Sequence, residues 1–194
     1  MKTKTDIPRS LWTRVVYLAA AGLVAATVAS LTLLKSSFSV GGLWNAQAHN
    51  RRSVDLVPFN GFVDAPVWYG PVVNTLGNLA LFVPVGFLAV LLWRTFSRPD
   101  PSRPAWHRRG VLWATCAGAV LSLGIEVAQF VFARGYTDVD DLILNTLGAT
   151  LGGWAAVRLR PELRRYALGV FCAGSVVVLV LMAAGAASAG ALVG

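Results

Sequence analysis

The sequence predicts an all-α membrane protein, a polytopic bundle of about five transmembrane helices. Residues of the set AVILMFWYC make up 56% of the 194 residues, and only 13% of the residues are charged. Soluble domains carry about 25% charged residues, so this chain has too few charges to hydrate a soluble surface. Five apolar segments are each near the ~20 residues that cross a ~30 Å hydrocarbon layer.

The five segments are predicted to be helices, because a backbone inside lipid must satisfy its own hydrogen bonds. They span residues 15–34, 72–93, 111–132, 139–157 and 167–193, and we treat residues 1–194 as a single membrane domain. The first segment has a basic flank and a Val28-Ala29-Ser30 sequence that would suit a signal peptidase. Because its apolar run continues to Leu34, we favour an uncleaved anchor over a signal peptide.

Basic residues are distributed unequally among the connections between these helices. Counted from the N-terminal tail, alternate connections together carry 13 of the 17 Lys and Arg residues, and the remaining connections carry 4. The positive-inside rule therefore predicts a cytoplasmic N-terminus and an external C-terminus. This topology, together with anionic lipid headgroups, accounts for the net charge of +8 without a nucleic-acid partner.

Polar side chains gather at the predicted outer ends of the three central helices. The spacing within each helix places them on one face, at intervals of three, four or seven residues. A short turn between the third and fourth helices adds one arginine. The set comprises Asn74, Asn78, Ser122, Glu126, Gln129, Arg134, Asp138, Asp141 and Asn145.

Glu126 lies about six residues inside its apolar run, which is roughly 9 Å at 1.5 Å per residue. A lone carboxylate at that depth costs on the order of 2–3 kcal/mol, so Glu126 is expected to face the bundle interior. Its natural partner is Arg134, for which Asp138 and Asp141 compete. Asp140 points away from the Asp141 face and is expected to be an interface residue.

Packing is the competing explanation for these residues. Asparagines often join membrane helices through hydrogen bonds worth about 0.6–2 kcal/mol, and Asn74 or Asn78 taken singly fits that role. Glu126, Arg134 and Asp141 together favour a binding site, because helix packing does not require several charges at one depth. The G-x-x-x-G formed by Gly148–Gly152 predicts close helix contact.

Several classes of enzyme and metal site are not supported. The sequence contains no H-E-x-x-H, G-x-S-x-G or P-loop motif. His49 and His107 fall in loops on opposite sides, so they cannot share a metal, and Cys116 and Cys172 lie in apolar helices as packing residues. Carboxylates alone could hold Ca²⁺ or Mg²⁺, but Arg134 among them favours an anionic ligand. No metal or cofactor is predicted.

A longer motif extends from the outer loop through the three central helices. It comprises Val57-Pro58-Phe59, Asn78-x-x-x-Phe82-x-Pro84-x-Gly86-Phe87, Ser122-x-x-x-Glu126-x-x-Gln129, Arg134, Asp138-x-Asp140-Asp141 and Asn145-Thr146-Leu147-Gly148. This combination resembles the VanZ-like family over a core of about residues 54–154. The resemblance implies a multi-pass protein of the bacterial cell membrane and a link to resistance against the glycopeptide teicoplanin, the activity associated with the family's namesake. It implies no particular reaction.

These observations lead to one main functional hypothesis and two alternatives. The main hypothesis is an outward-facing polar pocket that binds or acts on a cell-envelope component, such as a lipid-linked or cell-wall intermediate. Arg134 would pair with the phosphate or carboxylate of this ligand. The ligand would be oriented by Asn74, Asn78 and Gln129, and a general base could be provided by Glu126 or Asp141. A non-catalytic scaffold and a proton-coupled transporter stay open, although no matching polar pathway continues through the inner half of the bundle.

Overall fold

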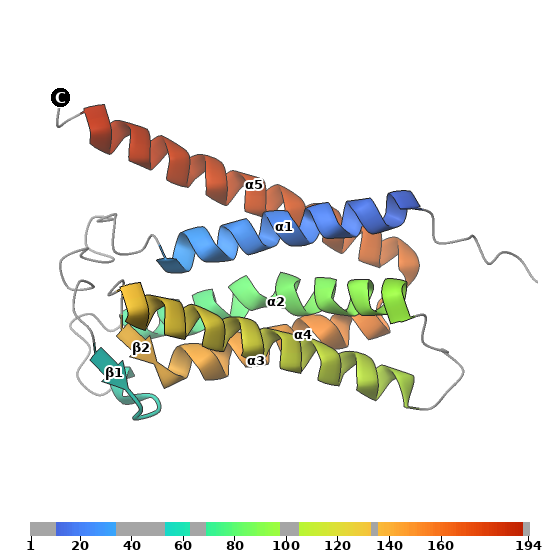
Figure 1. Ribbon diagram of the computed structural model, residues 1–194, viewed down its shortest axis with the longest axis horizontal. Coiled ribbons are helices and arrows are strands. Elements are labelled where there is room, and N and C mark those ends of the chain that lie inside the picture. The colour runs from blue at the N-terminus through green and yellow to red at the C-terminus, as the bar shows by residue number, and fades with distance from the viewer. Residues whose placement is uncertain (1–10, 34–52, 63–68, 98–104, 133–135, 192–194) are drawn as a thin grey trace, which may run out of the picture.

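The computed structural model describes residues 11–33, 53–62, 69–97, 105–132 and 136–191. Five α-helices form a bundle, and two short strands pair at one end of it (Figure 1). The all-helical bundle predicted from the sequence is therefore confirmed. The elements are α1 (Leu11–Leu33), β1 (Ser53–Asp55), the 3₁₀-helix η3 (Asn60–Phe62), α2 (Gly70–Ser97), α3 (Trp106–Phe132), β2 (Tyr136–Asp138), α4 (Val139–Arg158) and α5 (Pro161–Ala191).

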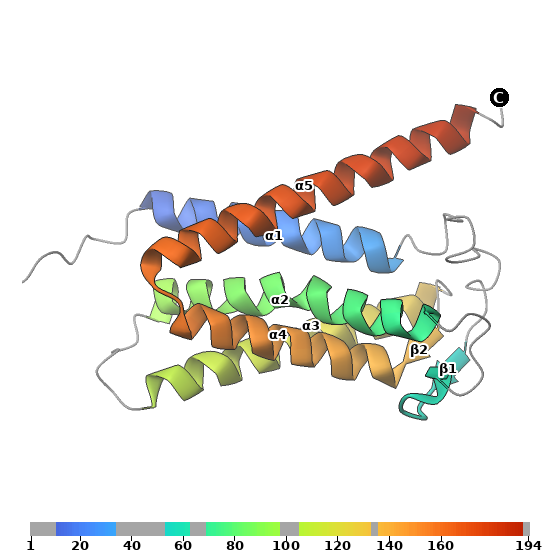
Figure 2. The same cartoon turned by 180° about the vertical axis from the view of Figure 1, so that it is seen from behind.

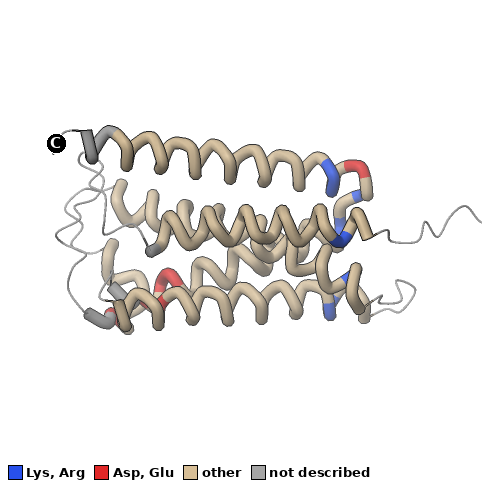
Figure 3. The backbone as a smooth tube through the Cα atoms, turned by 45° about the horizontal axis from the view of Figure 1, so that its top comes forward, with Lys and Arg blue, Asp and Glu red and all other residues tan. Residues whose placement is uncertain are grey.

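Successive helices run in opposite directions, so the ends of the bundle alternate along the chain (Figures 1 and 2). Most Asp and Glu residues lie toward one end of the bundle, and the Lys and Arg residues lie at the other (Figure 3). The acidic end holds the two strands, the last turns of α3 and the first turn of α4, and the acidic residues in these elements are Asp55, Glu126, Asp138, Asp140 and Asp141. The basic end is formed by the first turns of α1, α3 and α5 and the last turns of α2 and α4. Its charged residues are Arg14, Arg94, Arg108, Arg109, Arg158, Arg160, Glu162, Arg164 and Arg165. The positive-inside rule continues to predict that the basic end faces the cytoplasm.

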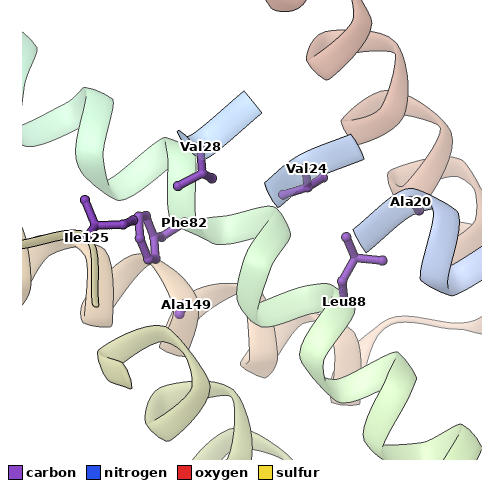
Figure 4. Close-up of a cluster of buried hydrophobic side chains, with 7 residues drawn as sticks. All are labelled: Ala20, Val24, Val28, Phe82, Leu88, Ile125 and Ala149. Carbon is purple, nitrogen blue, oxygen red and sulfur yellow. The ribbon is translucent and has the colours of Figure 1, made fainter. Parts of the chain in front are cut away.

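The apolar core runs through the centre of the bundle, where α1 packs on α2. In Figure 4, Val24 and Val28 of α1 point toward α2, and the fully buried ring of Phe82 lies between Ile125 of α3 and Ala149 of α4. A second cluster closer to the basic end is centred on Phe87, whose ring meets Phe171 of α5 edge-on at 5.3 Å. These apolar contacts hold the polar ends of the helices in register.

Glycines permit α2 and α4 to approach until their backbones touch. A Cβ atom added at Gly148 would overlap the carbonyl oxygen of Leu79, and one added at Gly152 would overlap that of Val83. Gly86 on α2 faces the Ala149 backbone in the same way. The G-x-x-x-G motif therefore packs against α2, whereas α3 is approached through Gly153 of α4. Small residues at a helix interface allow this close contact.

Four of the five helices are long and apolar enough to cross a membrane, namely α1, α2, α3 and α5. Helix α4 has the required length, since 20 residues rise about 30 Å. Its apolar character is reduced by Asp140, Asp141 and Asn145 and by several glycines. These residues are mostly buried against α2 and α3, so the polar side of α4 faces inward, whereas Leu147, Leu151 and Trp154 on its other side are exposed.

Apolar side chains cover much of the outer surface of the bundle. On α3, Leu112, Val120 and Val127 are each more than half exposed. Helix α5 contacts α1, and its C-terminal half slopes away from the bundle (Figures 1 and 2) with Val180 and Leu181 exposed. Such surfaces match lipid rather than water, which agrees with a membrane protein.

The pairing of β1 with β2 was not predicted from the sequence. The two strands are parallel, with Ser53 opposite Tyr136, Val54 opposite Thr137 and Asp55 opposite Asp138. Three residues per strand are too few to produce a recognisable alternating pattern. The ladder holds β1, which belongs to the connection between α1 and α2, beside β2, which leads into α4. This part of the α1–α2 connection therefore lies at the acidic end.

Candidate functional site

The polar face of α3 is buried, as the sequence predicts. Ser122, Glu126 and Gln129 are 0%, 4% and 6% exposed. Ser122 Oγ accepts a hydrogen bond of 3.0 Å from the side-chain amide of Asn145 on α4, which is itself 2% exposed. The stripes predicted on α3 and α4 therefore face each other, and Glu126 points into the bundle.

Asp141 joins α4 to α2. Its Oδ1 atom accepts hydrogen bonds from the side-chain amides of Asn74, at 3.2 Å, and Asn78. The two asparagines lie one turn apart on α2, so both amides reach the same carboxylate. The predicted group of Asn74, Asn78 and Asp141 is thus brought together, with Asp141 as the shared acceptor.

Asp138 and Glu126 link β2, α3 and α4. Glu126 Oε2 accepts a 3.1 Å hydrogen bond from the backbone N–H of Asp138. Asp138 caps α4, because its Oδ1 accepts a 2.8 Å bond from the N–H of Asp140, which is the usual role of an aspartate at that position. Burial raises the pKa of Asp138 to about 6; the Asp140 N–H lowers this pKa, and the carboxylates of Asp141, Asp140 and Asp55 raise it.

Asp140 has a role that the sequence did not reveal. It was expected at the interface, but its side chain is 8% exposed, and both of its oxygens accept from the backbone N–H of Phe59, at 2.9 and 3.0 Å. Phe59 adopts the left-handed conformation with φ of 59°, which is uncommon for a residue with a side chain. Asp140 therefore holds the Val57-Pro58-Phe59 segment of the motif against the start of α4.

The neighbouring turn is held by a second carboxylate. Asp55 accepts from the Val57 N–H at 3.0 Å and from the Asn60 side-chain amide at 2.6 Å. The Asn60 bond, followed by the Val57 bond, lowers the pKa of Asp55. A carboxylate followed two residues later by its own N–H donor is a common turn motif, and this spacing is the signal that could have identified Asp55 in the sequence.

Two buried side-chain oxygens in this region have no hydrogen-bond partner within the described part of the chain. They are Oε1 of Gln129 and Oδ1 of Asn145. The amide nitrogen of Gln129 donates to the Thr32 carbonyl of α1 at 3.1 Å, and that of Asn145 donates to Ser122. Arg134, predicted as the cation of the site, lies outside the described residues. No group of three or more His, Cys, Asp or Glu side chains in the described ranges could hold a metal.

Comparison with known proteins identifies the family. The model of the VanZ/LLP1 family matches residues 21–160. The chain belongs to this family. The matched range contains the 54–154 segment, including every described residue of the polar cluster, by which we mean Asn74, Asn78, Ser122, Glu126, Gln129, Asp138, Asp140, Asp141 and Asn145.

A curated VanZ/LLP1 relative is "Protein VanZ" of Enterococcus faecium, which is 29% identical over 130 residues. The alignment covers 67% of this chain and 66% of that protein, so the chain spans slightly less than two thirds of its relative. No solved structure matches the chain. Family membership and the apolar helices together identify the protein as a VanZ-like membrane protein.

Proposed function

We propose that the acidic end of the bundle binds an anionic component of the bacterial cell envelope that also carries hydroxyl or amide groups. A lipid-linked glycan or peptide intermediate of the wall has this chemistry. The proposal places the protein in the bacterial cell membrane with its acidic end outside, and it connects binding to glycopeptide resistance of the teicoplanin type.

The observation that carries this proposal is the pair of buried carbonyl oxygens, on Gln129 and Asn145, that have no hydrogen-bond partner among the described residues. A buried polar atom without a partner costs about 1–3 kcal/mol, so a stable fold seldom leaves two in one region. Both atoms are acceptors, and hydroxyl or amide groups of a ligand would supply the missing donors. Arg134, two residues beyond the end of α3, would supply the cation for the phosphate or carboxylate of the same ligand.

Glu126 and Asp141 have a supporting role in this proposal. Their described oxygen contacts are with protein donors, namely the Asp138 N–H for Glu126 and two asparagine amides for Asp141. Such contacts fix the positions of carboxylates near the ligand. A general base would additionally need to reach a ligand proton, so binding is the simpler function, and a reaction is an extension of it.

A structural scaffold is the second candidate, and the hydrogen bonds themselves favour it. Asn145 joins α4 to α3, Asp141 joins α4 to α2, and Asp140 joins α4 to the Phe59 turn. Each bond connects separate elements, as hydrogen bonds between membrane helices commonly do. An experiment must therefore separate the ligand from the helix contacts.

Ser122 and Asn145 allow that separation. Ser122→Ala removes the bond between α3 and α4 and leaves the Asn145 carbonyl in place, whereas Asn145→Ala removes both. Each variant is expressed in a teicoplanin-sensitive Gram-positive host, and membrane abundance is measured beside teicoplanin sensitivity. Binding predicts that Ser122→Ala keeps most of the protection and that Asn145→Ala loses it at equal abundance.

Equal loss of protection and abundance in both variants would instead support the scaffold.

A second pair of variants tests Arg134, the proposed cation of the site. Arg134→Lys keeps the charge but loses the planar fork that grips phosphate or carboxylate at two points, so the protein should insert normally and lose protection. Arg134→Ala should also lose protection and accumulate less. Full protection from Arg134→Lys would contradict ligand recognition by this residue.

A further inference from the structure

A cavity of about 180 Å³ opens at the basic end, far from the polar cluster. It lies between the first turns of α1, the last turns of α2 and the first turns of α5. Thr13 and Tyr17 line it from α1, Thr95 from α2, and Leu168 from α5. It is smaller than the ~300–1,000 Å³ pockets that hold drug-sized ligands, so it suits a single headgroup.

Three arginines give this cavity its charge. Arg94 of α2 and Arg164 and Arg165 of α5 line it, and no Asp or Glu is among its lining residues. Pro161, the first residue of α5, also lines the cavity, so the partially positive end of that helix adds to the field. Glu162 in the same turn is exposed and does not line it.

The three arginines differ in their surroundings, and Arg165 is the most exposed of them. The Arg94 guanidinium lies 4.9 Å from the centre of the buried Trp106 ring, a cation–π contact. Arg164 is half-buried, and its buried Nε has no hydrogen-bond partner within the described ranges. A partly buried guanidinium whose Nε has no acceptor among the described residues is suited to an acceptor supplied by a bound anion.

We propose that this cavity is a second binding site, which takes a phosphate group. Guanidinium groups bind phosphate through paired N–H donors, and two residues that carry hydroxyl groups, Thr13 and Tyr17, line the same cavity. Basic pockets between membrane helices on the cytoplasmic side bind anionic headgroups, and the charge distribution predicts that side for the basic end. The phosphate comes either from an anionic lipid or from a soluble phosphate ester.

The test measures the unfolding midpoint of the purified full-length protein in a neutral detergent. Phosphatidylglycerol, phosphatidylcholine and soluble glycerol 3-phosphate are added in separate arms at equal concentration. A ligand that binds only the folded state raises the unfolding midpoint, and the rise grows with the logarithm of the ligand concentration once that concentration exceeds the dissociation constant. A rise with phosphatidylglycerol alone identifies a lipid source, and a rise with glycerol 3-phosphate identifies a soluble source. Phosphatidylcholine, which has no net charge, should give no rise.

Two cavity variants and one matched control locate the effect. Arg164→Gln with Arg165→Gln should abolish the rise. Thr13→Trp, which fills the cavity and keeps every arginine, should also abolish it and guards against a folding defect in the first variant. Arg108→Gln with Arg109→Gln removes the same charge from the same end at exposed positions outside the cavity, and it should keep the full rise.

The proposal is overturned if no phosphate compound raises the midpoint of the unmodified protein. It is equally overturned if the control loses the rise as completely as the cavity variants do, because binding would then depend on the net charge of the basic end. Retention of the full rise by Thr13→Trp would also contradict binding inside the cavity.

Discussion

The two ends of the bundle carry opposite charges and hold them by different means. At the acidic end, carboxylates accept hydrogen bonds from backbone N–H groups and asparagine amides on other elements, as Asp140 does from Phe59. At the basic end, arginines lie over aromatic rings, as Arg14 does over Phe96 at 5.7 Å and Arg158 over Trp154 at 5.3 Å. Hydrogen bonds are directional and fix the positions of the carboxylates at the acidic end. Cation–π contacts are less directional and restrict the arginine side chains at the basic end less.

This difference fits the two kinds of ligand proposed. A site that distinguishes one envelope component from another needs donors and acceptors fixed relative to each other. A site for a lipid headgroup needs positive charge and a cavity large enough for the phosphate. Variants that change each end in turn test whether this division holds.

The largest effect is expected where α2 and α4 touch. Gly152→Ala places a methyl group against the Val83 backbone, and we expect a loss of about 3 kcal/mol in the free energy of unfolding. Separating α2 from α4 also pulls Asn74 and Asn78 away from Asp141, while the phosphate response of the basic end survives. Unfolding in mixed detergent measures the change. Gly174→Ala on α5, where a Cβ meets nothing within 4 Å, is the control and should not destabilise.

Removing the shared acceptor should have the next largest effect. Asp141→Ala leaves two asparagine amides without their acceptor, at a cost of about 1–3 kcal/mol. Asp141→Asn keeps an oxygen at that position and should cost less than half as much. Unfolding midpoints of both variants provide the comparison. Equal costs for alanine and asparagine would show that charge, rather than the hydrogen bonds, matters at this position.

A pH effect is expected from Asp138. Its pKa of about 6 in the folded protein exceeds its ordinary value of 3.8, so the folded state binds this proton more tightly than the unfolded state. The contribution to stability is therefore greatest below about pH 4 and is lost as the pH rises through 6. Asp138→Asn, which still caps α4, should flatten the profile of unfolding midpoint measured from pH 4.5 to 7.5. An unchanged slope in this variant would assign the titration to another group.

The smallest effect is expected from an exposed cation–π pair. Arg158→Gln should cost only about 0.5 kcal/mol, because Trp154 is 52% exposed and cation–π pairs at exposed sites contribute little. The measurement is again the unfolding midpoint. A loss as large as that of Asp141→Ala would show that the basic end also depends on individual contacts, and the contrast between the ends would disappear.

Helix positions and the buried faces could be predicted because both follow from local pattern. The apolar runs locate five helices, and the 3.6-residue period places Ser122, Glu126 and Gln129 on one side. The cost of an unpaired charge in lipid predicts that Glu126 faces inward. Each of these statements depends on residues within one helix.

Contacts between distant segments could not be predicted in the same way. Asp140 meets Phe59 across 81 residues, and no local rule connects them. Helical spacing correctly separates Asp140 from the Asp141 face, but it cannot show that the loop occupies the space beside it. The cavity at the basic end arises where three helix ends meet, so its arginines are near each other only after folding. The sequence shows that arginines are in excess on one side of the membrane, but it does not show which of them lie close together.

The parallel ladder between β1 and β2 imposes an order on assembly. Strand β1 is synthesised before α2, and strand β2 only after α3, so the two strands cannot pair until the helical hairpin between them has entered the membrane. Asp138 sits in that ladder and also caps α4, so the late pairing and the start of α4 occur together. The acidic end therefore cannot form until β2 and the start of α4 have been synthesised, and a chain interrupted before residue 136 would reach the bilayer without this site.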